Sequence, residues 1–329
     1  MSEWFKSDWP VSQWLPSASP EGLAARADLL QALRRFFCDR GVMEVETPLI
    51  SQGTVPDPGI EVFRLPGEGD QPDRYLQTSP ESAMKRLLAA GSDDIFQICK
   101  AFRKGEAGSH HNPEFTLLEW YRVGWDHAAL MREVADLLGT VLNLDGWQVW
   151  PYRAIFVELL DVDPLDEQVS LTTLMDLAQS RIGPLPERLE RDAVLDLLMS
   201  HCIEPGISDW GVVFITDFPP SQVAMARSIT VSDADVAARF ECYVHGKELA
   251  NGYWEQIDAD AVSAQLQAEN KRRQQRGLSP RPIDERLLAA HRHGLPECAG
   301  VALGVDRLLA VKLAVDNLGE TISFGWDSA

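Results

Sequence analysis

The chain has 329 residues, of which 45% are hydrophobic, so it is long enough to bury a full core as one large domain. Its formal net charge of −20, from 30 Lys and Arg against 50 Asp and Glu, argues against a protein that binds nucleic acid through broad phosphate contacts. No apolar run approaches the roughly 20 residues that cross a bilayer, and the five scattered cysteines never have C-x-x-C spacing, so we expect a cytoplasmic protein without a zinc site or disulfide framework.

The first predicted elements are a helix over residues 21–40 and a strand over residues 42–48. Apolar residues recur at helical spacing from Leu23 to Phe37, and Gly41 follows as a C-cap. The strand sequence VMEVETP alternates between apolar and polar residues and ends at a proline. By periodicity alone this is an ordinary helix–strand unit.

Residues 51–73 are rich in proline and glycine and are predicted to form a long loop, which favours a functional surface. The sequence TSPE then leads into a helix predicted over residues 82–90. Its Thr or Ser can cap the helix, its proline suits the first turn, and Glu81 favours the positive end of the helix dipole. Capping by itself accounts for Glu81.

Two strands joined by a polar loop are predicted over residues 95–103 and 115–122. Because side chains alternate along a strand, Glu119 and Tyr121 share one face with an aromatic residue. The other face carries Thr116, Leu118, Trp120 and Arg122. Arg103 ends the neighbouring strand. A half-exposed hairpin fits the periodicity, but a ring, a carboxylate, a phenol and a guanidinium on one face indicate a ligand-binding surface.

The second half of the chain begins with an amphipathic helix predicted over residues 127–142. Further helical patterns over 171–180 and 188–201 are broken by Gly-Pro and Pro-Gly steps, and no catalytic motif occurs among them. We therefore predict a helical insertion over about residues 150–235. An apolar, β-branched run over 210–218 predicts a buried strand.

Two further motifs lie near the C-terminus. The segment KELANGYWE spans residues 247–255, and strand parity would put Glu248 and Glu255 on opposite faces. The Asn251-Gly252 step is where a bulge or bend could bring them to one face. The segment AGVALGVDRLLAVKL, residues 299–313, is predicted to be a strand that passes through a glycine into a helix.

The residues quoted so far carry a family resemblance. The sequence FRKGEAGSHHNPEFTLLEWY is similar to motif 2 of class II aminoacyl-tRNA synthetases, specifically of the lysyl group. RRFFCDRGVMEVETP resembles motif 1, the helix and strand through which these enzymes dimerise, and AGVALGVDRLLAVKL resembles the third motif. The resemblance implies an α+β class II catalytic core over residues 1–329, a mainly antiparallel sheet flanked by helices with the helical insertion, and a homodimer.

Lysyl-tRNA synthetases carry an anticodon-binding barrel ahead of motif 1, and we expect none here. The chain most resembles the stand-alone elongation factor P–lysine lysyltransferases, which activate (R)-β-lysine, or more weakly lysine, and transfer it to a lysine side chain of elongation factor P. That resemblance implies elongation factor P as the acceptor partner. The densest basic cluster, residues 271–276 with Arg281, is interpreted as a solvated helix end and loop, so tRNA is not expected as a partner.

The resemblance also implies roles for individual residues. The catalytic group is Arg103, His111 and Arg307. The residues that bind the amino acid, with Glu81 receiving its α-amino group, are Ser79, Pro80, Glu81, Glu119, Tyr121, Glu255 and Ala302. Those that bind ATP are Arg103, Lys104, Gly105, Glu106, His111, Asn112, Phe115, Glu248, Leu249, Gly304 and Arg307. The carboxylates that hold Mg²⁺ are Glu241 and Glu248.

These residue types suit amino-acid activation. The substrate carboxylate is already ionised and attacks the α-phosphorus of ATP, so catalysis is positioning and neutralisation of phosphate charge. Arg103 can bridge that carboxylate and the α-phosphate, while Phe115 and Arg307 can sandwich adenine. Glu119 and Glu255, with the nearby phenol, make an anionic pocket suited to an ammonium group, which favours lysine or a close analogue over neutral amino acids.

Two positions depart from the lysyl-tRNA synthetase pattern. Motif 2 of that group usually reads Arg-x-Glu, with a glutamate that helps fix adenine, whereas Gly105 stands there in this chain and the acid follows at Glu106. Backbone groups or Glu106 would then supply the adenine contacts. Ala302 stands where lysyl-tRNA synthetases usually have glycine, and one methyl group in a tight pocket changes the preference between homologous substrates by ~1–3 kcal/mol.

Three alternative functions stay open on the sequence. A truncated lysyl-tRNA synthetase core would act on tRNA together with an RNA-binding partner. A different amino-acid ligase on the same fold, such as an asparagine-forming one, would lack the ammonium-binding side chains. A non-catalytic, lysine-sensing paralogue is the third, and the presence of Arg103, Glu248 and Arg307 argues against it.

Overall fold

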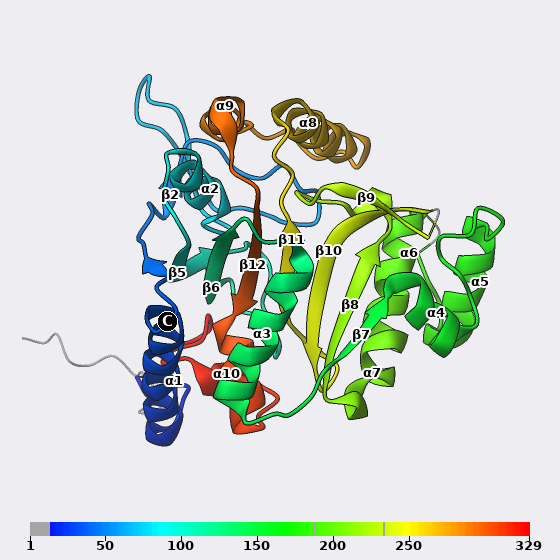
Figure 1. Ribbon diagram of the computed structural model, residues 1–329, viewed down its shortest axis with the longest axis horizontal. Coiled ribbons are helices and arrows are strands. Elements are labelled where there is room, and N and C mark those ends of the chain that lie inside the picture. Colours follow the sequence, from blue (N-terminus) through cyan, green and yellow to red (C-terminus); the bar gives the residue numbers. More distant parts are fainter. Residues whose placement is uncertain (1–13, 187, 233) are drawn as a thin grey trace, which may run out of the picture.

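A long twisted sheet organises the molecule (Figure 1). The computed structural model describes residues 14–186, 188–232 and 234–329. Within these residues the large sheet has nine strands in the order β1-β5-β6-β12-β11-β10-β8-β7, with β9 paired to β10. The strands are β1 (Met43–Glu44), β5 (Ile95–Phe102), β6 (Glu114–Val123), β7 (Gln148–Pro151), β8 (Val212–Phe218), β9 (Ser228–Val231), β10 (Ala234–Val244), β11 (Lys247–Trp254) and β12 (Cys298–Gly304).

The central strands of this sheet are antiparallel, and only the end pairs β1–β5 and β7–β8 are parallel. A second, three-stranded sheet in the order β2-β4-β3 lies beside it, formed by β2 (Ile50–Ser51), β3 (Arg64–Leu65) and β4 (Arg74–Leu76). Strands with helices around them make this an α+β fold, and the predicted fold class is confirmed.

The helices of the described residues are α1 (Pro20–Cys38), α2 (Glu81–Ala89), α3 (His127–Leu142), α4 (Tyr152–Leu160), α5 (Leu171–Ile182), α6 (Arg191–Leu198), α7 (Glu204–Gly206), α8 (Ala259–Gln275), α9 (Glu285–Gly294) and α10 (Val305–Leu313). None of them has both the length and the apolar content that crossing a membrane requires. The strand predicted over residues 42–48 is shorter than expected, because only Met43 and Glu44 pair with β5 before the chain turns away toward a proline.

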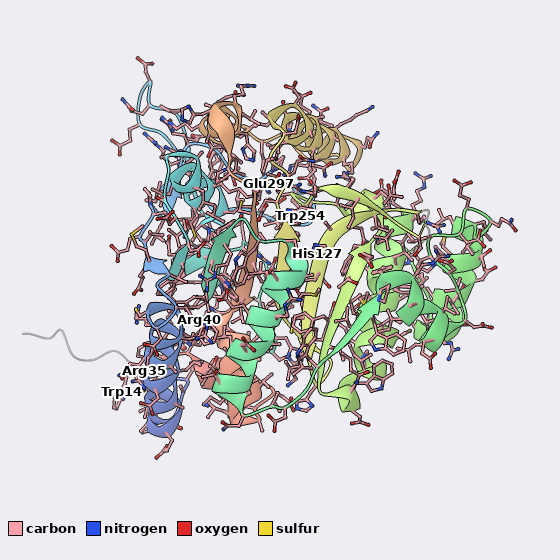
Figure 2. All side chains as sticks on the ribbon, in the orientation of Figure 1. Trp14, Arg35, Arg40, His127, Trp254 and Glu297 are labelled. Atoms are coloured by element: carbon pink, nitrogen blue, oxygen red, sulfur yellow. The ribbon has the colours of Figure 1, made fainter. Side chains whose placement is uncertain are left out.

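Local sequence signals fix several of these boundaries. Ser19 caps α1, and Asp126 caps α3 by accepting a hydrogen bond of 2.7 Å from the amide of Ala129. Asn143 ends α3 in the left-handed region, as Asn tolerates at a helix C-terminus. At its start α3 contacts the end of β11, where the rings of His127 and Trp254 stack with centroids 6.2 Å apart (Figure 2).

The main core lies between α1, α3 and α10 and one face of the large sheet. Phe37 of α1 stacks on Phe96 of β5 with ring centroids 4.7 Å apart, and both lie against the sheet beside Trp120. Leu118 and Trp120 are fully buried on this face. Since residues alternate along β6, Glu119 and Tyr121 point to the opposite face, as predicted.

Helices α4–α7 form a lobe that connects β7 to its parallel neighbour β8 (Figure 1). Tyr152 and Phe156 stack at its centre and Tyr152 also contacts Phe218 of β8, so the lobe has its own apolar core on the sheet. The predicted helical insertion over 150–235 is therefore too long: the apolar, β-branched run of β8 hydrogen-bonds to strands on both sides within the large sheet.

Candidate active site

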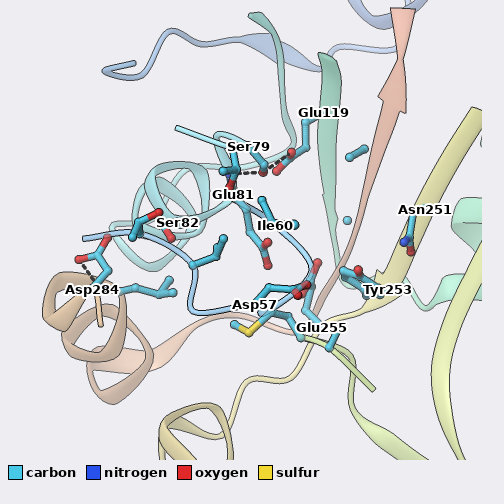
Figure 3. Close-up of a pocket in the computed structure, with 18 of the residues that line it drawn as sticks. Asp57, Ile60, Ser79, Glu81, Ser82, Glu119, Asn251, Tyr253, Glu255 and Asp284 are labelled. Carbon is cyan, nitrogen blue, oxygen red and sulfur yellow. Dashed lines mark hydrogen bonds between the residues drawn. The ribbon is translucent and has the colours of Figure 1, made fainter. Parts of the chain in front are cut away.

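An acidic pocket of about 190 Å³ opens on the face of the sheet opposite α1, α3 and α10 (Figure 3). Strands β6, β11 and β12 line it from below, and residues of α2, α8 and α9 surround it. It brings together six of the residues that the resemblance assigns to the amino acid, namely Ser79, Glu81, Glu119, Tyr121, Glu255 and Ala302. Pro80, the seventh, lies outside this pocket and lines an adjoining groove.

Glu119 lies at the centre of β6 and is only 2% exposed. The hydroxyl of Tyr121 donates to its Oε1 at 2.7 Å, and the hydroxyl of Ser79 donates to its Oε2 at 2.8 Å. Ser79 also accepts the amide of Glu81 at 3.0 Å, so the start of α2 is tied to this carboxyl. Burial, reinforced by the charge of Glu81, raises the pKa of Glu119 to about 8.

Lys85 is a site residue that sequence reasoning missed. Its side chain is fully buried, and its Nζ lies 2.6 Å from Glu81 Oε1 and 2.6 Å from Glu255 Oε2. Burial lowers the pKa of Lys85, but the charges of Glu255 and Glu81 outweigh it, so the net pKa is raised and the ammonium stays charged. The pair Glu81–Lys85 has i,i+4 helical spacing, which is the only local signal.

Glu255 follows β11 and is 1% exposed. Burial raises its pKa to about 7, although the charge of Lys85 opposes the rise. Its Oε2 lies 2.6 Å from the Nζ of Lys85, so this buried carboxylate already has a cationic partner. The ammonium group of a ligand that reaches Glu255 would share the carboxylate with Lys85.

Gly300 of β12 makes this arrangement sterically feasible. A Cβ at this position would lie 2.3 Å from the ring of Tyr121 and 2.6 Å from Glu255 Oε1. The absence of a side chain therefore lets the phenol and the carboxylate approach the strand. Ala302, two residues along on the same face, is paired with Glu119 and with Asn251 on either side and carries the methyl group noted in the sequence.

A second pocket of about 430 Å³ continues from the acidic one. Residues that line both pockets include Arg103, Asn251, Tyr253 and Ala302, so the two form one cleft with Arg103 at the junction. The residues here that the resemblance assigns to ATP are Arg103, Glu106, His111, Asn112, Phe115, Glu248, Leu249, Gly304 and Arg307. Lys104 and Gly105 line neither pocket.

Cationic and aromatic groups face each other in this second pocket. Arg307 donates to the carbonyl of Glu248 at 3.0 Å and lies 2.9 Å from Nε2 of His111. Burial and the neighbouring charge of Arg307 lower the pKa of His111, so its ring is neutral near pH 7. The guanidinium of Arg103 lies over the ring of Phe115, 5.1 Å from its centroid.

The loop between β5 and β6 explains the unusual glycine of motif 2. Gly105 has φ +86°, a conformation that L side chains rarely adopt. The acid one position later, Glu106, lines the pocket and lies 3.8 Å from Arg103. Asn112 closes the loop, since its amide group donates to the carbonyl of Glu114 at 2.6 Å and accepts the amide of Trp326 at 2.9 Å.

Comparison with known proteins decides the family. The family model of class II tRNA synthetases (D, K and N) matches residues 13–328. The chain belongs to this family. It is 46% identical, over 97% of its own length and 99% of the relative's, to a Pectobacterium atrosepticum protein named elongation factor P–(R)-β-lysine ligase. Proteins of the same name from Edwardsiella ictaluri and Yersinia enterocolitica are each 45% identical, over 97% and 95% of this chain and 99% and 98% of theirs.

In this class II synthetase a bulge aligns the carboxylates of β11, but not where the sequence suggested. The register of β10 against β11 passes from the pair Cys242–Ala250 directly to Tyr243–Glu248, which leaves Leu249 unpaired. The extra residue reverses the alternation, so Glu248 points to the same cleft as Asn251. The bulge expected at the Asn251-Gly252 step is absent there, because both residues pair regularly with β10 and β12.

Glu241 lies in a third cavity, of about 170 Å³, that it shares with Glu248 and Glu204. Its carboxylate pairs with Arg239 and accepts the hydroxyl of Tyr243 at 2.5 Å. Burial raises the pKa of Glu241, and the charge of Glu248 adds to the rise. Among the described residues no group of three or more His, Cys, Asp or Glu side chains is arranged to hold a metal ion by itself.

The basic cluster of α8 fixes one wall of the synthetase cleft. Arg273 and Arg281 are 4% and 7% exposed, so the prediction that this cluster is solvated was wrong for both. Arg273 donates to the carbonyl of Asp57 at 3.2 Å, Arg281 donates to that of Val55 at 3.0 Å, and both pair with Glu61. They hold the loop that follows β2 against the acidic pocket, which Val55 and Asp57 line.

Proposed function

We propose that this class II synthetase activates (R)-β-lysine, or less efficiently lysine, with ATP and transfers the aminoacyl group to a lysine side chain of elongation factor P. In the first step a carboxylate oxygen of the amino acid attacks the α-phosphorus and pyrophosphate leaves, giving the aminoacyl-adenylate. In the second, the acceptor amine attacks the carbonyl carbon, AMP leaves, the nitrogen loses a proton and an amide forms. The names of the similar proteins support this acceptor.

The observation that carries the proposal is the place of Arg103 at the junction of the acidic pocket and the second pocket, which Arg307 also lines. A diamino acid bound with its ammonium groups among the carboxylates would present its own carboxylate toward Arg103. ATP bound in the second pocket would bring its α-phosphate to the same guanidinium. Arg103 then stabilises the charge that both reactants share in the transition state, and no general base is needed for activation.

The ammonium groups are recognised by buried carboxyls. Glu119 and Glu255 line the pocket together with Glu81, while Lys85 supplies one fixed positive charge against the three. The surplus of negative charge suits a substrate with two ammonium groups. A neutral amino acid would leave this surplus of negative charge uncompensated in a buried pocket, which disfavours its binding.

The nucleotide end would take ATP together with Mg²⁺. Phe115 offers a ring for adenine, and Arg307 and His111 face the terminal phosphates in this proposal. Glu241 and Glu248 supply only oxygen donors and leave coordination positions for phosphate oxygens and water, which is the usual manner of Mg²⁺ binding. When bound, the ion neutralises phosphate charge.

We further propose that the enzyme is a cytoplasmic homodimer that does not use tRNA. Its five cysteines are all free thiols, in agreement with a reducing compartment. The segment of α1 and β1 that resembles the dimerisation motif exposes Met43, 52% accessible, and the neighbouring Leu49 and Ile50 are also exposed. Such apolar side chains suit a partner surface.

Two assays test the proposed function. Pyrophosphate exchange into ATP is measured with (R)-β-lysine, lysine and the neutral analogue norleucine, and we expect exchange in that order with norleucine close to background. Elongation factor P is then incubated with enzyme, ATP and (R)-β-lysine, and mass spectrometry should show the addition of one lysyl group to one lysine. Exchange with no such addition, or charging of bulk tRNA, would contradict the acceptor assignment.

A further inference from the structure

A groove of about 250 Å³ adjoins the acidic pocket on the outer side of α2. Residues of α2, β2, β4 and the start of α9 line it, and α2, β2 and α9 lie at the upper left of Figure 1. It shares lining residues with the acidic pocket, namely Thr54, Val55, Thr78, Ser79, Ser82 and Asp284. A group that docks in the groove is therefore next to the bound amino acid.

Three arginines from three different elements converge on this groove: Arg74 of β4, Arg86 of α2 and Arg286 of α9. All three are exposed, and within the described residues none has a carboxylate oxygen within 4.0 Å. Two carboxylates close to them in sequence are already engaged. Asp73 pairs with Arg64 at 2.5 Å, and Asp284 accepts the backbone amide of Arg286 at 3.0 Å as the cap of α9.

This concentration of positive charge is unlike the molecule as a whole, whose formal net charge is −20. An acidic surface repels carboxylate groups at long range, so a segment that carries them approaches best at a local region of opposite sign. Three unpaired guanidinium groups around one concave surface provide it. Arg side chains are also suited to bidentate contact with carboxylates.

We propose that this groove docks an acidic segment of the acceptor protein, next to the lysine that receives the aminoacyl group. The inference rests on the proposed function and adds the surface through which the acceptor is recognised. A protein segment suits the groove better than a nucleic acid does, because proteins that hold nucleic acid commonly neutralise about six to ten phosphates. Three cations in a small groove match a few carboxylate side chains instead.

The test is charge reversal in the groove. The single variants Arg74→Glu, Arg86→Glu and Arg286→Glu and the triple variant are assayed for pyrophosphate exchange and for transfer to elongation factor P. We expect exchange with (R)-β-lysine to stay within about twofold of wild type, while kcat/KM for the acceptor falls about threefold to tenfold for each single change and about a hundredfold for the triple, mainly through KM. A triple Arg→Gln variant, which perturbs the helix ends less, should show an intermediate loss.

Salt and matched controls separate this effect from a general loss of charge. Transfer by wild type should weaken between about 50 and about 200 mM salt, and the triple variant should lose that dependence. Arg132→Glu on α3 and Arg181→Glu on α5, both exposed and outside the groove, should transfer like wild type.

Unchanged transfer by the triple variant would overturn the proposal. A fall in pyrophosphate exchange that matches the fall in transfer would also overturn it, since the groove would then serve the amino acid. Competition for the groove by bulk tRNA alone would overturn it as well. Failure of the proposed function looks different: wild-type enzyme would exchange pyrophosphate and leave elongation factor P unmodified. Melting temperature and oligomeric mass, measured for every variant, exclude misfolding as the cause of a loss.

Discussion

At the scale of single residues, the acidic pocket must balance the charges of three carboxyl groups that lie close together. Glu81, Glu119 and Glu255 line one pocket, and two of them are nearly inaccessible to water. Lys85 lies between two of these carboxylates and offsets part of their repulsion. The third, Glu119, lowers its charge by holding a proton, since its pKa is raised to about 8. The proton thus reduces the negative charge of the empty pocket, and a substrate ammonium displaces it from Glu119.

Replacement of Lys85 tests this balance through stability. Lys85→Met leaves Glu255 buried without its counter-charge, so we expect a loss of about 3–5 kcal/mol in the free energy of unfolding near pH 8. The loss should be smaller near pH 5.5, because a carboxyl without a cation takes up a proton more readily and the protonated form is easier to bury. Urea denaturation at both pH values measures it.

Lys271→Met is the matched control, because Lys271 is an exposed lysine of α8, and its stability should stay within about 0.5 kcal/mol of wild type. A loss for Lys85→Met as small as that of the control would show that the buried ammonium does not balance the pocket.

The proton on Glu119 predicts how substrate use depends on pH. The pKa of this carboxyl is raised in the free enzyme, so its ionised form becomes rarer as pH falls below about 8. Binding of an ammonium group requires the ionised form, so kcat/KM for (R)-β-lysine in pyrophosphate exchange should rise about tenfold or more from about pH 6.5 to about pH 8.5. Glu119→Gln should be less active and should lose the ionisation near pH 8. A wild-type profile that is flat across this window contradicts the assignment.

At the scale of elements, the strands set which side chains reach the cleft. Alternation along β6 is a local property, so the sequence alone predicts that Glu119 and Tyr121 face the ligand while Leu118 and Trp120 face the core. The bulge at Leu249 is not local, because it depends on how β10 pairs with β11. Side-chain alternation alone puts Glu248 and Glu255 on opposite faces of the strand. It does not show where a bulge corrects this.

The same difference between local and long-range contacts explains why the sequence did not reveal the role of Lys85 or the burial of Arg273 and Arg281. Helical spacing relates Lys85 to Glu81, but its second partner, Glu255, is far away in the chain and is brought near only by the fold. The sequence predicts Arg273 and Arg281 to be surface residues because their partners are distant in the chain. These partners are two backbone carbonyls and Glu61 in the loop that follows β2. The sequence alone does not predict these contacts, because they join residues that are far apart in the chain.

Gly300 of β12 offers a test at the level of strand packing. Gly300→Ala places a methyl group against Tyr121 and Glu255, which must shift to admit it. We expect kcat/KM for exchange with (R)-β-lysine to fall about ten- to a hundredfold, since displacements near 1 Å at a binding group cost up to about a hundredfold. Gly325→Ala, where the added Cβ meets only Ser17 at 3.6 Å, is the control and should be unaffected. Equal activity of the two variants would show that the close approach is not needed.

At the scale of the whole molecule, one continuous cleft runs across the sheet from the acidic pocket to the pocket lined by Phe115 and Arg307. The main core and the core of the α4–α7 lobe lie under the two halves of the sheet and keep its strands in place. Family motifs located the site residues along the chain, but the shared lining of the two pockets, with Arg103 between them, is a property of the assembled fold.

The most direct measurement is a crystal structure with a non-hydrolysable sulfamoyl analogue of (R)-β-lysyl-adenylate. We expect the side-chain ammonium of the analogue to lie within hydrogen-bond distance of Glu119 or Glu255. We expect its sulfamate beside Arg103 and its adenine between Phe115 and Arg307. An ammonium group directed to solvent, or an adenine ring seated among the carboxylates of the acidic pocket, would contradict it.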